Sequence, residues 1–484
     1  MKYILSIDQS TSSTKAIIFD EQLNLVGRSN VEHNQIYPQA GWVEHDPNEI
    51  FNNLLKACSD VFNTTGVQKE NVVCLSISNQ RETAMLWDKK TGEPIYNAIV
   101  WQCCRGESIS SKPHIIKEAE TIRQKTGLVL SPYFSAAKVA WILENIDCKN
   151  KNIAFSTMDS WLVYKLTGNH YCDYTNACRT QLFNINSLEW DKDIIKLFGL
   201  ENISFPQIKC SDEIFGETNL GGLLNKPIPI AGILGDSHGA IFGQQCWNPG
   251  EGKCTMGTGS SLMINIGDKP QFSNSGLATS IGWKLKNDIK YVFEGNVNSS
   301  GDTINWLIDN MQILPNSKES ESYAQKVEST EGVYLVPAFT GLGAPHYKSN
   351  ARAVIWGMNR STNKYHIVRA ALESIVYQIK DVMVPMVKEA NIEFKELRVD
   401  GGPTNNKLLM QIMSDILDVN IIKNSIEELS ALGAASVGAI ATGIIKDKDA
   451  LSKLRRTGET YNNCMSPEKR EEMYNGWKTV VNKL

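Results

Sequence analysis

Neither of the two glycine-rich fingerprints of nucleotide binding occurs in this sequence of 484 residues. There is no G-x-G-x-x-G motif of a dinucleotide-binding fold and no G-x-x-x-x-G-K-[ST] phosphate loop. The eleven cysteines include no C-x-x-C pair and have no histidine at zinc-ligand spacing, so no structural metal site is predicted. These absences argue against a Rossmann oxidoreductase, a P-loop enzyme and a zinc domain.

Long apolar runs and an excess of charge of one sign are also missing. The most apolar helical stretch, residues 429–445, is interrupted by glycine and serine and is too short to cross a bilayer. The net charge is −4 with both signs interspersed, which disfavours nucleic acid or an anionic membrane as a partner. No leader peptide is recognisable at Met1. We therefore expect a cytoplasmic protein with reduced thiols, no membrane span and no nucleic-acid partner.

The length of the chain exceeds what one hydrophobic core usually serves, so two domains are expected. The proline-punctuated segment from Pro206 to Pro229 is the expected boundary. It gives an N-terminal domain of residues 1–227 and a C-terminal domain of residues 228–484. Amphipathic helices are predicted over residues 47–62, with Asp46 as the N-cap, and over residues 366–390.

Two hydroxyl-rich turns lie between β-rich runs, one near the start of each domain. Residues 10–14 are five consecutive serines and threonines, and Gly257-Thr258-Gly259 is followed by two serines. Such turns can offer backbone N–H groups and hydroxyls to an anion. A hairpin with a solvated polar turn explains either copy alone. The pair predicts an internal duplication of a phosphate-binding hairpin.

Polar and aromatic residues follow several predicted strands. An apolar run ends in Asp236, which is therefore a candidate general base facing a cleft. Arg81 and Glu82 follow another strand, at the edge where open α/β sheets build sites. They form either a surface salt bridge or a binding site for the hydroxyls of a polyol. Trp101 ends an expected strand, residues 95–101, and is either a core aromatic or an apolar wall for a carbon chain.

Three further segments carry predictions. Residues 299–302 precede a helix expected over residues 303–310, whose N-terminus is predicted to receive anionic groups. Residues 397–400 form a strand that breaks into Gly401-Gly402, which is either a second nucleotide-type turn or a plain tight turn. Residues 173–177 are expected to form a polar loop.

Several collinear motifs resemble the FGGY carbohydrate kinases over essentially the whole chain. They are Asp8-Gln9-Ser10-Thr11, residues 78–83 (Ser-Asn-Gln-Arg-Glu-Thr), residues 97–102 (Asn-Ala-Ile-Val-Trp-Gln), Tyr133-Phe134-Ser135 with Lys138 and Trp141, residues 173–177 (Asp-Tyr-Thr-Asn-Ala), Gly257-Thr258-Gly259, residues 337–345 (Pro-Ala-Phe-Thr-Gly-Leu-Gly-Ala-Pro) and Val399-Asp400-Gly401-Gly402. The resemblance implies an α/β, two-lobed, actin-like ATPase fold with duplicated RNase-H-like domains. The cleft between the lobes would close on ATP, Mg²⁺ and a small alcohol.

The resemblance also implies roles for individual residues. The acceptor would meet Arg81, Glu82, Trp101, Tyr133, Asp236 and Ser237, with Asp236 as the general base. The nucleotide would meet Thr11, Ser12, Ser13, Lys15, Thr258, Gly301, Asn305, Gly402 and Asn406, and the magnesium would lie near Asp8 and Asp236. The implied reaction is ATP-dependent phosphorylation of a terminal hydroxyl of a small polyol, glycerol first. A homodimer or a homotetramer is the expected assembly.

Some positions depart from the pattern of the family members that act on glycerol. They are Ser237-His238 for two glutamines, Ser261 for a phenylalanine, Lys15 for an arginine, His346 for a tryptophan and Ser10 for a glycine. The first two changes predict a roomier, more polar acceptor pocket. A kinase for another polyol or a ketose is therefore an alternative, and a non-catalytic actin-like protein that binds ATP and a sugar is the alternative outside enzymes. Residues 222–227 lack the basic pattern by which some bacterial members bind an inhibitory sugar bisphosphate, so that control is not expected.

Overall fold

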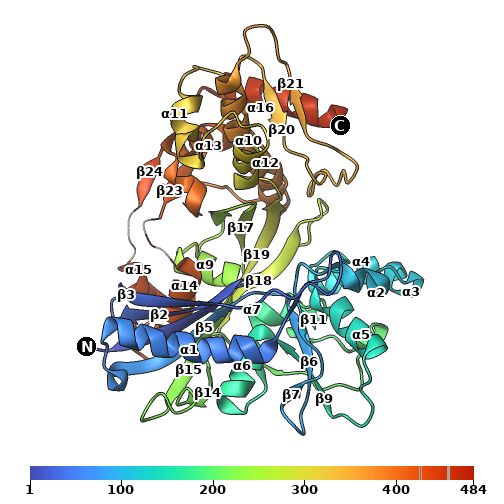
Figure 1. The fold of residues 1–484 in the computed structure, drawn as a ribbon, viewed down its shortest axis with the longest axis vertical. Coiled ribbons are helices and arrows are strands. Elements are labelled where there is room, and N and C mark those ends of the chain that lie inside the picture. The colour runs from blue at the N-terminus through green and yellow to red at the C-terminus, as the bar shows by residue number, and fades with distance from the viewer. Residues whose placement is uncertain (425, 427, 455–457) are drawn as a thin grey trace.

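The computed structural model describes residues 1–424, 426, 428–454 and 458–484. Figure 1 shows two lobes one above the other, the lower containing the N-terminus and the upper the C-terminus. The lower lobe is built on a six-stranded sheet and the upper lobe on a seven-stranded sheet. In the described part of the chain, no helix combines the length and the apolarity that a bilayer crossing needs.

The first sheet is centred on the antiparallel hairpin of β1 and β2. Its strands, from one edge to the other, are β14 (Ile214–Thr218), β15 (Ile228–Gly235), β5 (Val72–Asn79), β1 (Tyr3–Gln9), β2 (Ser13–Asp20) and β3 (Leu25–Glu32). β1, β5 and β15 are parallel to one another, whereas β3 and β14 are antiparallel to their neighbours. Parallel strands in the centre of such a sheet need helices on both faces, which explains why β1 and β5 are almost entirely buried.

Helices α1 (Pro47–Thr65) and α14 (Leu429–Ala441) cover opposite faces of this sheet. Leu5 packs with residues of α1, and its neighbour Ile4 packs with residues of α14. Successive strand residues point to opposite faces, so the two helices sandwich β1. The prediction for α1 is confirmed, because Asp46 accepts a hydrogen bond from the N–H of Asn48.

The second sheet repeats this plan. Its strands, from edge to edge, are β18 (Ala278–Leu285), β19 (Asp288–Val297), β17 (Ser260–Gly267), β16 (Glu251–Met256), β22 (Glu396–Asp400), β23 (Asn420–Lys423) and β24 (Glu459–Tyr461). β16, β17 and β19 are antiparallel, and β22 and β23 run parallel to β16. The helices of this lobe include α10 (Gly301–Asp309), α12 (Lys364–Ala390), α13 (Lys407–Leu417) and α16 (Pro467–Lys483).

The order of strands is therefore the same in both lobes. β1, β2, β3, β5 and β15 correspond to β16, β17, β19, β22 and β23 in position and direction. The tips of the two corresponding hairpins are the two hydroxyl-rich turns of the sequence. The predicted internal duplication of the hairpin is confirmed, and phosphate binding by its two turns stays a prediction.

The lobes do not divide the chain at residue 227. β15 pairs with β5 in the first sheet, so this sheet continues to Gly235. The proline-rich stretch before it contains the edge strand β14 and the turn into β15, because proline is tolerated at sheet edges and turns. Helix α14 also returns from the second half of the chain to pack on β1, β5 and β15. A boundary after residue 227 separates β15 from the sheet to which it belongs.

Two local predictions are wrong. Of the strand expected over residues 95–101, only β8 (Ala98–Ile99) forms, and it pairs with β4 (Glu44–His45) and β6 (Ala84–Asp88). The loop expected at residues 173–177 is the short helix α7 (Tyr174–Ala177). Its N-cap, Asp173, is fully buried because its carboxylate accepts N–H groups from the first turn.

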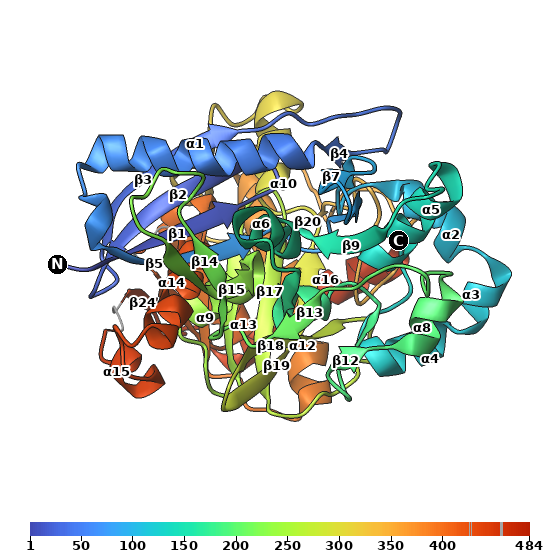
Figure 2. The same cartoon turned by 90° about the horizontal axis from the view of Figure 1, so that it is seen from below.

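A smaller sheet and a group of helices extend the first lobe sideways, as Figure 2 shows. The sheet contains β4, β6, β8, β7 (Glu93–Pro94) and β9 (Ile153–Thr157). The helices are α2 (Glu107–Ser110), α3 (Pro113–Lys117), α4 (Ala119–Thr126), α5 (Ser135–Asn145) and α8 (Lys192–Leu197). Together they position the residues that follow β5 and β8.

Candidate active site

Arg81 is the centre of a group of charged side chains at the end of β5. Its Nε donates to Oδ1 of Asp236 at 2.8 Å, and its Nη2 donates to Oγ of Ser237 at 3.1 Å. Its Nη1 and Nη2 donate to the two carboxylate oxygens of Glu294 at 2.8 and 2.9 Å. Three of the predicted acceptor residues are thus in direct contact. The fourth member, Glu294 on β19, belongs to the second lobe.

Glu82 joins the same group through Arg179. The Nε of Arg179 donates to Glu82 at 2.6 Å, and its Nη1 lies 3.1 Å from Glu294. Burial raises the pKa of the Glu82 carboxyl and outweighs the lowering by Arg179 and Arg81. Burial also acts on Glu294, but the two guanidinium groups hold its pKa well below its usual range. Glu294 is therefore an ionised carboxylate shared between two buried arginines.

Asp236 is the first residue of α9 (Asp236–Gly243), directly after β15. Its side chain is 37% exposed, in contrast to the buried arginine beside it. Oδ1 accepts from Arg81 and from the backbone N–H of Ser237 at 2.6 Å, and no described residue donates to Oδ2. Gly235 permits this packing, because a Cβ there would lie 2.7 Å from Cγ and Cδ of Arg81. The arrangement leaves one carboxylate oxygen available to an acceptor hydroxyl.

Trp101 and Tyr133 form an aromatic pair beside this group. Their ring centroids are 5.6 Å apart in an edge-to-face arrangement. The buried ammonium of Lys138 donates to the backbone carbonyls of Pro132, Tyr133 and Phe134 and so fixes the loop before α5. The indole N–H of Trp101 donates to Oγ1 of Thr11 at 3.0 Å. The predicted acceptor wall is therefore bonded to the predicted phosphate hairpin.

A chain of hydrogen bonds supports the same hairpin from behind. The amide of Gln80 donates to Nδ1 of His45, Nε2 of His45 bonds Oε1 of Gln35, and the amide of Gln35 donates to the carbonyl of Thr11. Burial and, to a smaller extent, the neighbouring His33 lower the pKa of His45 to about 3. The imidazole of His45 is therefore neutral, and Nδ1 serves as an acceptor.

Asp8 lies near the end of β1 with its carboxylate buried. Its Oδ1 has no hydrogen-bond partner among the described residues. The pKa of Asp8 is raised to about 7, mainly by burial and also by the nearby Glu428 and Asp236, against the lowering effect of Lys15. Lys15 itself is held at 2.7 Å by Glu428. A buried carboxylate oxygen without a donor suits a cation.

The residues predicted to face the nucleotide from the second lobe gather around one cavity of about 650 Å³. This volume lies within the range of small-molecule sites. Thr258, Gly301, Asn305, Gly402 and Asn406 all line it, together with apolar side chains of α10, α12 and α13. The described lining residues all come from the second lobe. Thr11, Ser12, Ser13 and Lys15 lie instead on the hairpin of the first lobe.

Both hairpin tips expose backbone N–H groups. Those of Thr11, Ser12 and Thr258 donate to no described residue. The N-terminus of α10 differs from the prediction, because its first N–H groups are already engaged. Gly301 donates to the carbonyl of Gly257 and Asp302 to that of Thr258. Helix α10 thus buttresses the tip of the second hairpin and does not itself present a free anion site.

The side chain of Asn406 and the bare turn at Gly402 shape the cavity. Oδ1 of Asn406 caps α13 and its amide donates to Ser320 at 3.1 Å. Gly401 has a φ of +99°, and a Cβ there would lie 1.9 Å from the carbonyl oxygen of Met256. Nothing occupies the Cβ position of Gly402. This turn is therefore tight and leaves its cavity side bare.

The carboxylates near the hairpin of the first lobe fit a magnesium ion only if the phosphates of a nucleotide complete its coordination. No cluster of three or more metal-ligating side chains occurs in the described ranges. Mg²⁺ is commonly bound by one or two carboxylates, water and the phosphates of a nucleotide. Asp8, with its unpartnered oxygen, matches that requirement, and Asp236 lies close enough to affect its pKa.

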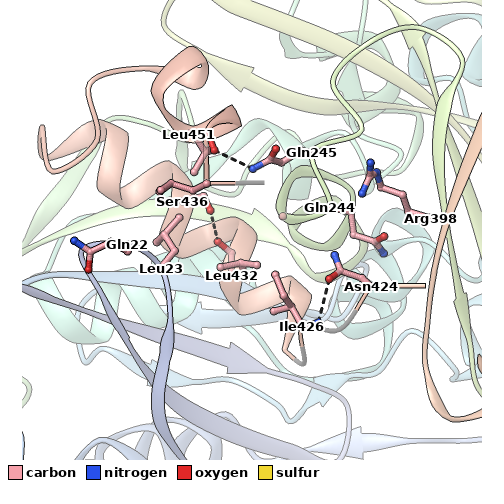
Figure 3. A pocket seen from close by; sticks show the side chains of 12 residues that line it. Gln22, Leu23, Gln244, Gln245, Arg398, Asn424, Ile426, Leu432, Ser436 and Leu451 are labelled. Atoms are coloured by element: carbon pink, nitrogen blue, oxygen red, sulfur yellow. Dashed lines mark hydrogen bonds between the residues drawn. The ribbon is translucent and has the colours of Figure 1, made fainter. Parts of the chain in front are cut away.

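A second, much smaller cavity of about 30 Å³ lies at the junction of the lobes. Figure 3 shows Gln244, which follows α9, beside Arg398 of β22 and Asn424, and the next residue, Gln245, bonded to Leu451. Nε of Arg398 and the Oε1 atoms of both glutamines have no partner among the described residues. The volume suffices for one or two water molecules and not for a substrate.

Comparison with known proteins shows the family to which the chain belongs. The sequence model of the N-terminal domain of the FGGY family of carbohydrate kinases matches residues 3–243, and that of the C-terminal domain matches residues 252–442. The chain belongs to the FGGY family of carbohydrate kinases. The fold is accordingly the two-domain, actin-like α/β fold of these kinases.

Individual relatives of this FGGY chain cover its whole length. Glycerol kinase 1 of Thermotoga maritima is 48% identical over 100% of this chain and 99% of its own length. The glycerol kinase of Halothermothrix orenii is 42% identical over 99% of this chain and 98% of its own length. The crystal structure of Plasmodium falciparum glycerol kinase with ADP superposes with a TM-score of 0.92 at 38% identity, covering 100% of this chain and 98% of that one.

Two charged residues of the candidate site were missed in the sequence. Arg179 follows the motif at residues 173–177, and Glu294 interrupts an apolar strand. A charged residue inside an apolar strand is almost never fully buried unless it is paired. That rule marks Glu294 as part of a polar network, although the sequence does not reveal its partners.

Proposed function

We propose that this FGGY kinase transfers the γ-phosphoryl group of ATP to a terminal hydroxyl of glycerol, giving sn-glycerol 3-phosphate. The observation that carries the proposal is the carboxylate of Asp236, held on one oxygen by Arg81 and open on the other. A nucleotide-sized cavity in the second lobe and relatives that are glycerol kinases support it.

The residues of the chain supply what phosphoryl transfer needs. An alcohol is a weak nucleophile, so Oδ2 of Asp236 takes its proton as the oxygen attacks phosphorus. The free N–H groups of Thr11, Ser12 and Thr258 stabilise the charge on the transferred group. Magnesium held by Asp8 would neutralise charge on the phosphates. The two hairpins belong to different lobes, so approach of the lobes assembles the phosphate site and excludes water.

The acceptor pocket is expected to be roomy at one end. Ser237 and Ser261 are small, and Oγ of Ser237 already accepts from Arg81. Trp283 does not refill the space, because it is fully buried and its indole donates to Asp288. An apolar void discriminates against longer chains by only about 1–3 kcal/mol. We therefore expect glycerol to be phosphorylated with a weaker apparent affinity than in typical glycerol kinases.

The same two serines favour a second candidate function, a kinase for a four- or five-carbon polyol or a ketose. A screen of ADP release with glycerol, dihydroxyacetone, erythritol, ribitol, xylitol and xylulose distinguishes the two. Product from glycerol, with weaker activity on one longer polyol, supports the first. Efficient turnover of a longer acceptor without any product from glycerol removes glycerol and leaves the kinase class. Absence of ADP release with every acceptor favours a non-catalytic ATP- and sugar-binding protein.

The location and the metal cofactor of the reaction are also proposals. We propose that the reaction takes place in the cytoplasm, where ATP is available, and that Mg²⁺ is its cofactor. Removal of Mg²⁺ with EDTA should abolish turnover, and added Mg²⁺ should restore it.

A homodimer or a homotetramer is the proposed assembly, which light scattering on the purified chain measures.

A further inference from the structure

Glu294 belongs to β19 of the second lobe, yet its carboxylate lies among side chains of the first lobe. Its side chain is 2% exposed, and its two oxygens accept hydrogen bonds from Arg81 at 2.8 and 2.9 Å. Arg179, also from the first lobe, lies 3.1 Å from Oε2. The contact is therefore a buried charge pair that crosses from one lobe to the other.

The hydrogen bonds of Arg81 show what this contact does. A guanidinium group has five N–H donors in one plane. One N–H points to Asp236, two point to Glu294 and one points to Ser237. Glu294 holds the edge of the plane formed by Nη1 and Nη2, and the second N–H of Nη2 goes to Ser237. Nη2 is therefore fixed by Glu294 and Ser237 together, and Nε alone donates to Oδ1 of Asp236.

We propose that Glu294 is a positioning residue for the transfer reaction, which holds Arg81 so that Oδ2 of Asp236 stays free for the acceptor hydroxyl. This inference rests on the proposed function of Asp236 as the base. Arginine and a carboxylate prefer two parallel hydrogen bonds when nothing else restrains them. Without Glu294, Arg81 is free to bind both oxygens of Asp236, and the base is then blocked.

The chain offers a matched control for the loss of a buried carboxylate. Glu373 on α12 is 3% exposed, and its carboxylate lies 3.2 Å from Arg369. It belongs to the second lobe as well. It does not line the nucleotide cavity, and its ion pair is with Arg369 and not with the group around Arg81. Glu373→Gln therefore removes the same chemical group from a similar setting that has no part in positioning Asp236.

The test measures kcat and the KM for ATP with the best acceptor from the screen. Glu294→Gln should lower kcat by about 10- to 100-fold, the usual effect of losing a group that orients a site residue, and should leave the KM for ATP within about twofold. This split between kcat and KM separates a positioning role from a loss of nucleotide binding. Glu373→Gln should keep the wild-type kcat and the wild-type KM for ATP.

Glu294→Asp keeps the charge but shortens the reach to Arg81, so an intermediate kcat is expected. If Glu294→Gln does not fold, this variant decides the matter, and a wild-type kcat in it overturns the positioning role. Equal kcat values for Glu294→Gln and Glu373→Gln overturn it as well. A wild-type protein that phosphorylates no acceptor refutes the proposed function itself, which is a different result.

Discussion

One carboxylate oxygen of Asp236 accepts two hydrogen bonds and the other is open to an acceptor hydroxyl. This difference predicts how the variant Asp236→Asn behaves. Asp236→Asn retains the size of the side chain but cannot accept a proton. Turnover should fall by at least about 100-fold, the scale on which general bases act. Nucleotide binding should persist, because Asp236 does not line the cavity of the second lobe. Steady-state kinetics and calorimetric titration with ADP measure the two effects, and near-normal turnover removes Asp236 from the role of base.

His45 predicts a pH dependence of stability. The unfolded chain protonates this histidine near pH 6.5, whereas the folded protein does so only near pH 3. The unfolded state therefore binds more protons in this window, and stability falls as the pH drops. Between pH 6.5 and pH 5 the contribution is about 2 kcal/mol. Urea unfolding at both pH values should show this loss in the wild type.

The comparison that isolates the effect uses two variants. His45→Gln removes the titrating group, so the loss between pH 6.5 and pH 5 should shrink by about 2 kcal/mol. His114 lies on the surface, and His114→Gln should leave the loss unchanged. Identical pH dependence in the wild type and in His45→Gln contradicts a neutral, buried His45.

Individual residues of the candidate site could be predicted from the sequence where they belong to a local motif. Arg81, Asp236 and Ser237 meet in the structure, and Thr258 and Gly402 line one cavity, as their motifs suggested. Glu294 and Arg179 were missed because their contacts join segments far apart in the chain, which no local pattern encodes. The roles of all these residues in catalysis remain predictions.

At the scale of elements, the packing of α14 depends on its small residues. A Cβ on Gly433 would lie 1.9 Å from the carbonyl oxygen of Gly239 in α9. Gly433→Ala must therefore push the helix away from α9, and overpacking of this kind costs about 3 kcal/mol. Urea unfolding measures the change. The control is Ser436→Ala on the same helix, which removes a hydroxyl bonded only to Leu432 among the described residues and should cost less than about 1 kcal/mol.

Elements were predicted well where periodicity and end signals agreed. The hairpins, α1 and the long helix α12 follow their sequence patterns. Of the strand expected over residues 95–101, only two residues form a strand, because pairing with β4 and β6 ends at Ile99. Polar side chains of residues 173–177 form hydrogen bonds with one another inside the lobe. A polar segment in a sequence is by itself more typical of a loop, so the helix was not predicted. Strand pairing decided the first case, and the capping hydrogen bonds of Asp173 decided the second.

For the whole molecule, the division of the phosphate-binding turns predicts closure. Thr11 and Ser12 belong to the first lobe, and Thr258 belongs to the second. Small-angle scattering should show a smaller radius of gyration when a non-hydrolysable ATP analogue and the acceptor are both bound. Each ligand alone should give a smaller change. No compaction beyond that of either ligand alone contradicts closure as the means of excluding water.

Helix α14 is synthesised late but packs on the sheet of the first lobe, and this limits the order in which the protein can fold on the ribosome. The face of β1 that holds Ile4 stays uncovered after β15 has been made, because its covering helix is encoded about two hundred residues later. At roughly 5–20 residues per second, this interval lasts roughly 10–40 s. A nascent chain with an exposed apolar sheet is a chaperone substrate for that time. Translation speed between the two segments should therefore govern the yield of soluble protein.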